Sequence, residues 1–191
     1  MREDLDIYQY SEIMSEAKLI TWNQLPEFAV YCDQMLQIVR DGLRFMQISD
    51  GKLITKSMVN NYVKWDMIPK PEKKKYEKLH IACVIVITIL KQVLPISSIK
   101  TGIELQIVLQ GQEKAYDSFC EVFEKSMKKV FVPIVEKRNP YVLDEEIINY
   151  DKLAISSITA ALANKLLTEK IIETKIKKHA YLAKIEGDAH E

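Results

Sequence analysis

Apolar residues begin to recur at helical spacing shortly after Trp22. They follow one another at mainly three- and four-residue steps as far as Met46, with Pro26 near the start. Proline is tolerated in the first turn of a helix, because the N–H that it lacks has no partner there. The pattern predicts an amphipathic helix that ends at about Met46. Its apolar stripe is Phe28, Tyr31, Met35, Ile38, Val39 and Phe45.

A second helix is predicted from Thr55 to about Asp66, after a turn at 49–52. Thr55 is a candidate N-cap, because a threonine hydroxyl accepts hydrogen bonds from the N–H groups of the first turn. Pro69 and Pro71 prevent the helix from continuing. The two helices and their short turn make a helix-turn-helix candidate. The inward stripe is Met58, Val59, Tyr62 and Val63, and Lys56, Asn60, Asn61 and Lys64 face elsewhere.

The run 81–94 is the longest apolar stretch of the chain. Its valines and isoleucines favour a strand, and a fully buried strand would show the same local pattern. Fourteen residues without a turn residue are long for one strand, however, so a buried helix is predicted. Pro95 then ends this helix. Ser97 or Ser98 is expected to cap a short further helix that includes Ile99 and Ile103.

Two longer helices are predicted in the second half, over about 113–135 and 151–184, with Pro133 bending or ending the first. They can pack as an antiparallel hairpin or across a dimer, because core packing and oligomerisation produce the same spacing. One stripe is Tyr116, Phe119, Cys120, Phe123, Met127, Val130 and Phe131. The other is Ile155, Ile158, Leu162, Leu166, Ile172, Ile176 and Ala180.

The composition favours a helical chain with a sizeable core. Of 191 residues, 48% are hydrophobic, and only 5 are glycine and 6 are proline. The three cysteines lie far apart and indicate a reducing compartment. Residues 1–21 are rich in acidic side chains and lack the apolar region of a signal peptide. The simplest interpretation is a mobile or loosely docked acidic arm; an arm that screens a basic site is the alternative.

The densest basic cluster lies between residues 64 and 78. This stretch contains six lysines and three acidic residues, which gives a local charge of +3. The whole chain is neutral, with 27 basic and 27 acidic residues. A helix beside such a loop can enter the major groove of DNA, where asparagine pairs with adenine and lysines neutralise phosphates. Tyrosine hydroxyls can reach phosphate oxygens. The predicted DNA-binding residues are Thr55, Lys56, Asn60, Asn61, Tyr62, Lys64, Lys73, Lys74, Lys75 and Tyr76. A merely solvated loop is the alternative.

Catalytic and cofactor motifs are missing from the sequence. It has no glycine-rich phosphate loop, no Cys-x-x-Cys and no His-Glu-x-x-His spacing. Cys83 lies inside the apolar run and is more simply a core residue than a nucleophile. A pair of Cys120 with a distant histidine stays open. We therefore predict no enzyme, no cofactor and no metal. The apolar run at 81–90 is also shorter than the about 20 residues of a membrane span, so no membrane partner and a cytoplasmic location are expected.

Residues 54–69 read I-T-K-S-M-V-N-N-Y-V-K-W-D-M-I-P. This segment resembles the recognition helix of MerR-type transcription regulators, roughly V-S-x-x-T-(L/I)-R-Y-Y-E-x-x-G-L-(L/I)-P. The matching residues are Ile54, Thr55, Val59, Tyr62, Met67, Ile68 and Pro69. The family's wing and the apolar helix after it are similar to Lys75, Tyr76, Ile81, Val84, Ile87 and Leu90. Asn60 replaces a phosphate-binding arginine of that family, and Asp66 replaces a turn glycine.

A closer resemblance covers about residues 25–103. The stretches LPEFAVYCDQ, VNNYVK and IPKPEKKKY resemble a bacterial family of unknown function that is typified by the Bacillus protein YkrK. This resemblance implies a fold better than an activity, because a fold alone does not fix a function.

The predicted fold is mostly α: an acidic arm over 1–21, a MerR-like winged helix-turn-helix domain with a small wing over 22–103, and a helical dimerisation or effector region over 104–191. The resemblance implies a bacterial transcription regulator that binds double-stranded DNA as a homodimer, and leaves room for an unidentified small-molecule effector. The alternative is a non-catalytic protein-interaction module that retains the winged-helix fold.

Overall fold

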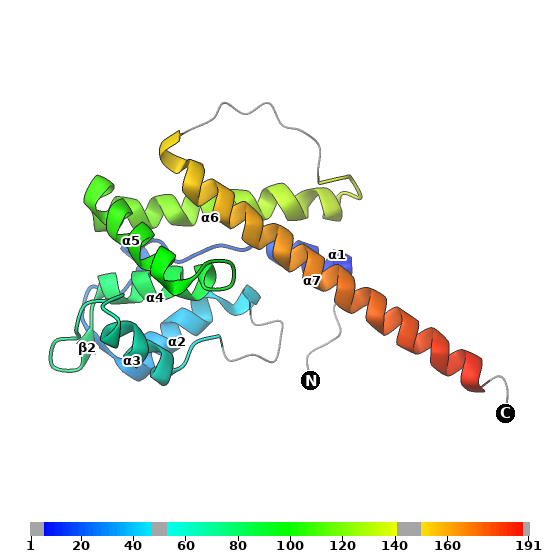
Figure 1. The fold of residues 1–191 in the computed structure, drawn as a ribbon, viewed down its shortest axis with the longest axis horizontal. Helices are drawn as coiled ribbons and strands as arrows, with labels where there is room; N and C mark the ends of the chain where they lie inside the picture. The colour runs from blue at the N-terminus through cyan, green and yellow to red at the C-terminus, as the bar shows by residue number, and fades with distance from the viewer. Residues whose placement is uncertain (1–5, 47–52, 141–149, 189–191) are drawn as a thin grey trace.

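The computed structural model describes residues 6–46, 53–140 and 150–188 (Figure 1). Within these ranges there are seven α-helices and one two-stranded antiparallel sheet, so the mostly α class is confirmed. The elements in chain order are α1 (Ile7–Ser15), the 3-10 turn η1 (Trp22–Gln24), β1 (Val30–Tyr31), α2 (Cys32–Gly42), the 3-10 turn η2 (Arg44–Met46), α3 (Lys56–Lys64), β2 (Lys75–Tyr76), α4 (Lys78–Leu90), α5 (Ile96–Gln110), α6 (Gln112–Val135) and α7 (Tyr150–Asp188).

α4 is the central helix. Every residue from His80 to Leu90 is buried, which confirms the predicted buried helix over the strand alternative. A helix that is apolar on all sides must be covered on all sides. α4 accordingly contacts α2 and β2 on one side and α5, α6 and α7 on the opposite side (Figure 1).

α2 begins later than the sequence pattern predicted. Residues 30–31 are extended because they pair with β2, Val30 opposite Tyr76. Phe28 and Tyr31 are 72% and 58% exposed, so the predicted helix is wrong for residues 26–31. The true inward face of α2 is Met35, Leu36 and Val39. The predicted turn at 49–52 lies outside the described residues.

α5 corrects a second boundary. It begins at Ile96, directly after Pro95, which occupies the N-cap position with φ −61°. Ser97 and Ser98 therefore lie in the first turn, and the predicted serine cap is wrong. α5 is also longer than predicted, with 15 residues, and ends at Gly111. The φ of +79° at Gly111 suits a residue without Cβ, and it separates α5 from α6.

α6 and α7 pack within one chain, but not as the predicted antiparallel hairpin. Lys152 pairs with Glu121, and further along both helices Thr159 and Ser126 share a buried hydrogen bond of 2.7 Å. The residue numbers rise along both helices from the first contact to the second, so α6 and α7 run in the same direction (Figure 1). The 14 connecting residues, 136–149, can extend over about 46 Å, and the 24 residues of α6 are only about 36 Å long. The connection is thus long enough to return along α6.

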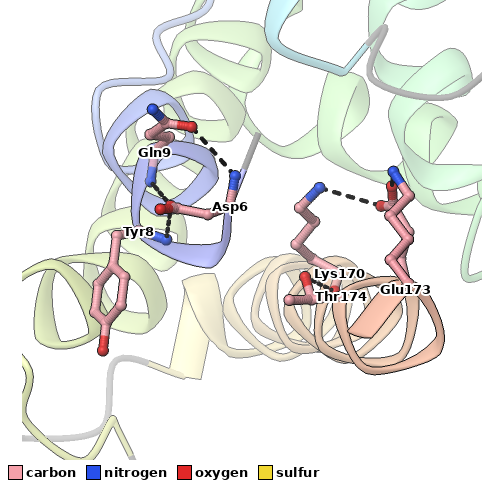
Figure 2. Close-up of polar contacts among 7 residues, drawn as sticks. Asp6, Tyr8, Gln9, Lys170, Glu173 and Thr174 are labelled. Carbon is pink, nitrogen blue, oxygen red and sulfur yellow. Dashed lines mark hydrogen bonds and ion pairs between the residues drawn. The ribbon is translucent and has the colours of Figure 1, made fainter. Parts of the chain in front are cut away.

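α1 is part of the core, so the expected loose arm is wrong for residues 7–15. Met14 is fully buried and Tyr10 is 5% exposed, and the ring of Tyr10 lies edge-on to Phe131 of α6. Asp6 caps the helix by accepting hydrogen bonds of 2.8 Å from the N–H groups of Tyr8 and Gln9 (Figure 2). An acidic sequence therefore conceals an apolar face that packs on α6 and α7.

A buried cation joins α1 to α7. The ammonium of Lys170 lies 5.5 Å from the centre of the Tyr10 ring. It also lies 3.2 Å from a carboxylate oxygen of Glu173 (Figure 2). Burial, followed by the charges of Glu169 and Glu173, raises the pKa of Tyr10 above its ordinary value. Cation–π and ion-pair contacts compensate Lys170 for its lost hydration.

Candidate nucleic-acid interface

The outer face of α3 is polar, basic and exposed. We define it as Lys56, Ser57, Asn60, Asn61 and Lys64. Residues four apart share one side of a helix, and no acidic residue occurs in α3. Neither asparagine amide hydrogen-bonds to another described residue, so both can still donate and accept. The opposite side of α3 is buried through Val59 and Tyr62.

The ends of α3 are fixed by local sequence. The hydroxyl of Thr55 accepts a hydrogen bond of 3.2 Å from the Met58 N–H, which confirms the predicted N-cap. At the other end the N–H groups of Met67 and Asp66 donate to the carbonyls of Tyr62 and Val63. This is a Schellman motif, and Asp66 supplies its left-handed residue with φ +52°. Asp66 thus adopts the conformation for which the MerR-type pattern uses glycine.

Three cations from neighbouring helices hold the segment that contains α3. Arg40 of α2 donates to the Ile54 carbonyl at 3.2 Å, and Lys91 at the end of α4 donates to the Leu53 carbonyl at 2.8 Å. Burial lowers the pKa of Lys91. Lys100 of α5 donates to the Trp65 carbonyl at 3.3 Å, at the end where a helix attracts positive charge.

A tight turn at the same end of the molecule as α3 carries the densest charge (Figure 1). We call residues 72–75 the lysine turn. The Lys75 N–H donates to the Glu72 carbonyl at 2.8 Å, and Lys73 and Lys74 have φ values of +46° and +63°. Positive φ at both central residues defines a type I′ turn, for which Asn-Gly is the favoured sequence. All three lysines of the turn are exposed, and Lys73 and Lys74 form no ion pair within the described ranges.

Strand β1, which pairs with β2, presents an aromatic side chain next to Lys75. Tyr31 and Lys75 are directly opposite in the β1–β2 pair, and the ammonium of Lys75 lies 5.5 Å from the centre of the Tyr31 ring. Tyr31 and Phe28 are exposed, and sequence reasoning placed both on the inward stripe of a helix. Their exposure follows from the pairing of residues 30–31 with residues 75–76, which is a non-local contact that helical spacing does not reveal.

Cys32 lies between strand β2 and the N-terminal end of α3. Burial raises the pKa of the Cys32 thiol, and the nearby charge of Lys56 opposes that effect. The thiol also lies against the hydroxyl of Tyr76, whose pKa is raised by burial and then by Cys32. The N-terminal end of α3 and strand β2 therefore meet at one half-buried side chain, and Figure 1 shows them at the same end of the molecule.

Three of the ten predicted contact residues do not fit their role. Thr55 is half-buried and its hydroxyl caps α3, and two tyrosines are buried. Tyr62 is 3% exposed and Tyr76 is 5% exposed, so neither ring is free to extend toward a phosphate. Both support the surface from below. Lys78, which was counted in the basic cluster, is mostly buried and pairs with Glu27. The residues that the structure leaves exposed are Lys56, Asn60, Asn61, Lys64, Lys73, Lys74 and Lys75.

His80 underlies this surface. Its Nδ1 accepts a hydrogen bond of 3.0 Å from the Glu77 N–H, and its ring meets Tyr76 edge-on at 5.4 Å. Burial is the largest influence on its pKa and lowers it. The Nε2 atom is buried without a hydrogen-bond partner among the described residues. The charge of Glu77 and the backbone of Pro69 and Lys70 act in the opposite direction, but they do not outweigh the effect of burial on the His80 pKa.

The described residues offer little support for a metal site, a reactive cysteine or a membrane span. They contain no group of three histidine, cysteine or acidic side chains placed to hold a metal ion. Burial raises the pKa of the Cys83 and Cys120 thiols to about 12, and a neutral thiol is a poor nucleophile. None of the helices in these ranges has a stretch long and apolar enough to cross a bilayer.

Comparison with known families places the candidate interface inside a shared domain. Residues 20–124, more than half of the 191, match the family described as Domain of unknown function (DUF1836). The chain belongs to this family. The DUF1836 match covers α2 to α5, both strands and the first half of α6, and leaves out α1 and α7. No curated protein and no solved structure matches the chain.

Proposed function

We propose that this DUF1836 protein binds duplex DNA through the outer face of α3 and the lysine turn, as a transcription regulator with a MerR-like winged helix-turn-helix. The observation that carries the proposal is the conformation of Lys73 and Lys74. A left-handed conformation costs an L-residue about 1–2 kcal/mol, and glycine or asparagine would reduce that cost. Strain of this kind is retained mainly where a function depends on the side chains, and two adjacent exposed ammonium groups suit phosphates.

The outer face of α3 supplies the groups that could read bases. An asparagine amide offers a donor and an acceptor that match adenine in the major groove. Asn60 and Asn61 have such amides uncommitted, and Lys56 and Lys64 flank them on the same side of the helix. Neighbouring lysines would contact phosphates and fix the register without reading sequence.

The order of the elements also supports the proposal. A strand, two helices and a second strand follow one another as β1, α2, α3 and β2, and the strands pair. The pairing holds the lysine turn next to α3, as a wing would be held. Asp66 takes the left-handed position at the end of α3 where the resembled family has glycine. Function of this kind would require a cytoplasmic location.

The test is selection of bound sequences from a random pool of duplex DNA, followed by binding titrations at several salt concentrations. The double variant Lys73→Ala, Lys74→Ala should bind more weakly, and the slope of log K against log salt should fall by about two, because two phosphate contacts are lost. The control is Lys114→Ala, Lys128→Ala, which removes two exposed lysines of α6 and should change neither quantity. An enriched motif with equal slopes in both variants would exclude the lysine turn, and no enrichment would exclude sequence-specific binding.

A second candidate function is a protein-interaction module, and one observation favours it. The C-terminal end of α5 exposes Leu105, Val108 and Leu109 by 53%, 82% and 66%. Adjacent exposed apolar side chains are typical of contact surfaces. Only weak DNA binding that salt abolishes, without an enriched motif, would favour this function over the first.

A further inference from the structure

We propose that the cavity between α4, α5, α6 and α7 binds an uncharged, largely apolar small molecule, and that its occupancy is transmitted to α3. The cavity has a volume of about 490 Å³, within the range of about 300–1,000 Å³ that is typical of small-molecule sites. The transmission to α3 rests on the proposed DNA-binding function; the binding of the ligand does not.

The floor of the cavity is deep and apolar. Ala82, Cys83 and Val86 of the central helix α4 form it, and each is at most 9% exposed. Protein interiors rarely leave a space of this size between packed helices. Ordered water needs several polar partners, and these side chains offer almost none. The floor therefore favours an apolar molecule over water.

The walls limit the charge of the ligand. No aspartate, glutamate, lysine, arginine or histidine lines the cavity in the part of the chain that the structure describes. A carboxylate or phosphate would lose its hydration there without gaining a partner, which is costly. Nucleotides, phosphosugars and ionised fatty acids are therefore excluded as good ligands.

A few neutral polar groups lie among the lining residues. Ser98 and Ser157 are exposed residues of α5 and α7, and Gln106 is half-buried. The Gln106 carbonyl oxygen accepts a hydrogen bond of 2.6 Å from Gln110, which leaves its amide N–H groups able to donate. The site thus suits a molecule with one hydroxyl or carbonyl group at the end of an apolar body, such as a long-chain alcohol.

The shape of the cavity argues against a second copy of the chain as its occupant. The opening between α5 and α7 is bordered by the small residues Gly102, Ala154 and Ala161. A stable dimer buries about 800 Å² on each partner, and this opening offers only a small part of such an area. A flat protein surface would also not reach Cys83, which is 5% exposed. A small molecule can enter and fill the depth.

Two of the cations that hold the α3 segment come from the end of α4 and from α5, and both helices line the cavity. Lys91 follows the last turn of α4 and binds the Leu53 carbonyl before α3, and Lys100 of α5 binds the Trp65 carbonyl after it. Ile99 and Leu90, next to these lysines, line the cavity. A ligand that alters the separation of α4 and α5 therefore acts on both ends of the α3 segment at once.

The ligand proposal is tested with N-phenyl-1-naphthylamine, a neutral fluorophore whose emission rises in apolar surroundings. The full chain should bind about one molecule per chain, and 1-decanol should displace the probe at a concentration about tenfold lower than decanoate does. Gly102→Leu and Ala161→Phe narrow the cavity from opposite sides. A Cβ at Gly102 meets no atom within 4 Å, so the fold tolerates the first variant.

Each narrowing variant should weaken probe binding by about tenfold or more with an unchanged circular dichroism spectrum. The control is Thr101→Leu, an exposed residue of α5 outside the lining, and should bind as the wild type does. Equal probe affinity in all four proteins would overturn the site. Failure of the probe to bind, together with a dimer that Gly102→Leu dissociates, would show that the cavity is an interface between copies and would also overturn it.

Transmission is tested separately. If the two sites are coupled, saturating 1-decanol should change the affinity of the wild type for its selected DNA. Lys100→Met should reduce that change and leave the binding of the probe intact. An unchanged DNA affinity would overturn transmission. Probe binding without any DNA binding would refute the proposed function and leave the ligand site standing.

Discussion

At the scale of single residues, Lys73 and Lys74 adopt a backbone that other residues would adopt more easily. Both have positive φ, and no glycine or asparagine relieves the turn. The sequence pattern identified these lysines by charge alone. It could not indicate their conformation, because the usual signals of a type I′ turn are Asn-Gly or Asp-Gly. Because charge and backbone strain occur at the same two residues, the lysine turn is a stronger candidate for a DNA-binding site than its charge alone made it.

Replacing the two lysines by the favoured turn sequence should separate stability from binding. Lys73→Asn, Lys74→Gly should raise the melting temperature by about 2–4 °C, equivalent to about 1 kcal/mol, because left-handed strain is relieved. DNA affinity should fall in the same protein, with a salt slope lower by about two. Thermal unfolding and fluorescence anisotropy measure the two effects. A variant that is less stable than the wild type would show that the turn is not strained.

At the scale of elements, local signals and non-local contacts explain which boundaries the sequence could predict. Thr55 and the prolines after residue 66 fix α3 through their own chemistry, and α3 was predicted to within two residues. The start of α2 depends on the pairing of Val30 with Tyr76, 46 positions away, and was missed. Helix periodicity identified α6 and α7 but not their parallel direction, which depends on how their faces fit.

His80 makes the β2–α4 junction sensitive to pH. Because burial lowers its pKa in the folded chain, the unfolded chain takes up the proton first as the pH falls. The free energy of unfolding is therefore fully retained above the ordinary value of 6.5 and decreases as the pH falls below it. Gln at this position can accept the same Glu77 N–H, as in a capping box, but does not titrate.

His80→Gln should therefore lose less stability on acidification than the wild type. The melting temperatures at about pH 7.5 and about pH 5.5, which span the titration of histidine, should differ by about 2–4 °C less in the variant. Differential scanning calorimetry provides the measurement. An equal decrease in both proteins would assign the acid sensitivity to the carboxylates.

At the scale of the whole molecule, the candidate interface lies at one end, and the C-terminal half of α7 extends to the other (Figure 1). The N-terminal part of α7 is anchored on α6 through Leu162, Ala163 and Leu167, all nearly fully buried. Farther along, Ile172 and Ile176 are 51% and 63% exposed and lie one turn apart. The sequence left core packing and oligomerisation equally open for α7, and the two alternatives now apply to different parts of this helix. Its first half packs within the chain, and its second half presents an apolar pair that would suit the homodimer that the MerR-type resemblance implies.

We expect the wild type to sediment as a dimer and the double variant Ile172→Glu, Ile176→Glu to sediment as a monomer, because facing carboxylates would repel each other. The affinity of the variant for a two-fold symmetric DNA site should fall by about a hundredfold. In a dimer, binding of one DNA-binding domain raises the effective concentration of the other at the second half-site, and a monomer loses this effect. Affinity for an isolated half-site should not change. Val108→Glu, Leu109→Glu is the matched control, with two exposed apolar residues of α5 altered in the same way. If that control dissociates the dimer and the α7 variant does not, the chains associate through α5, and the exposed half of α7 serves another contact.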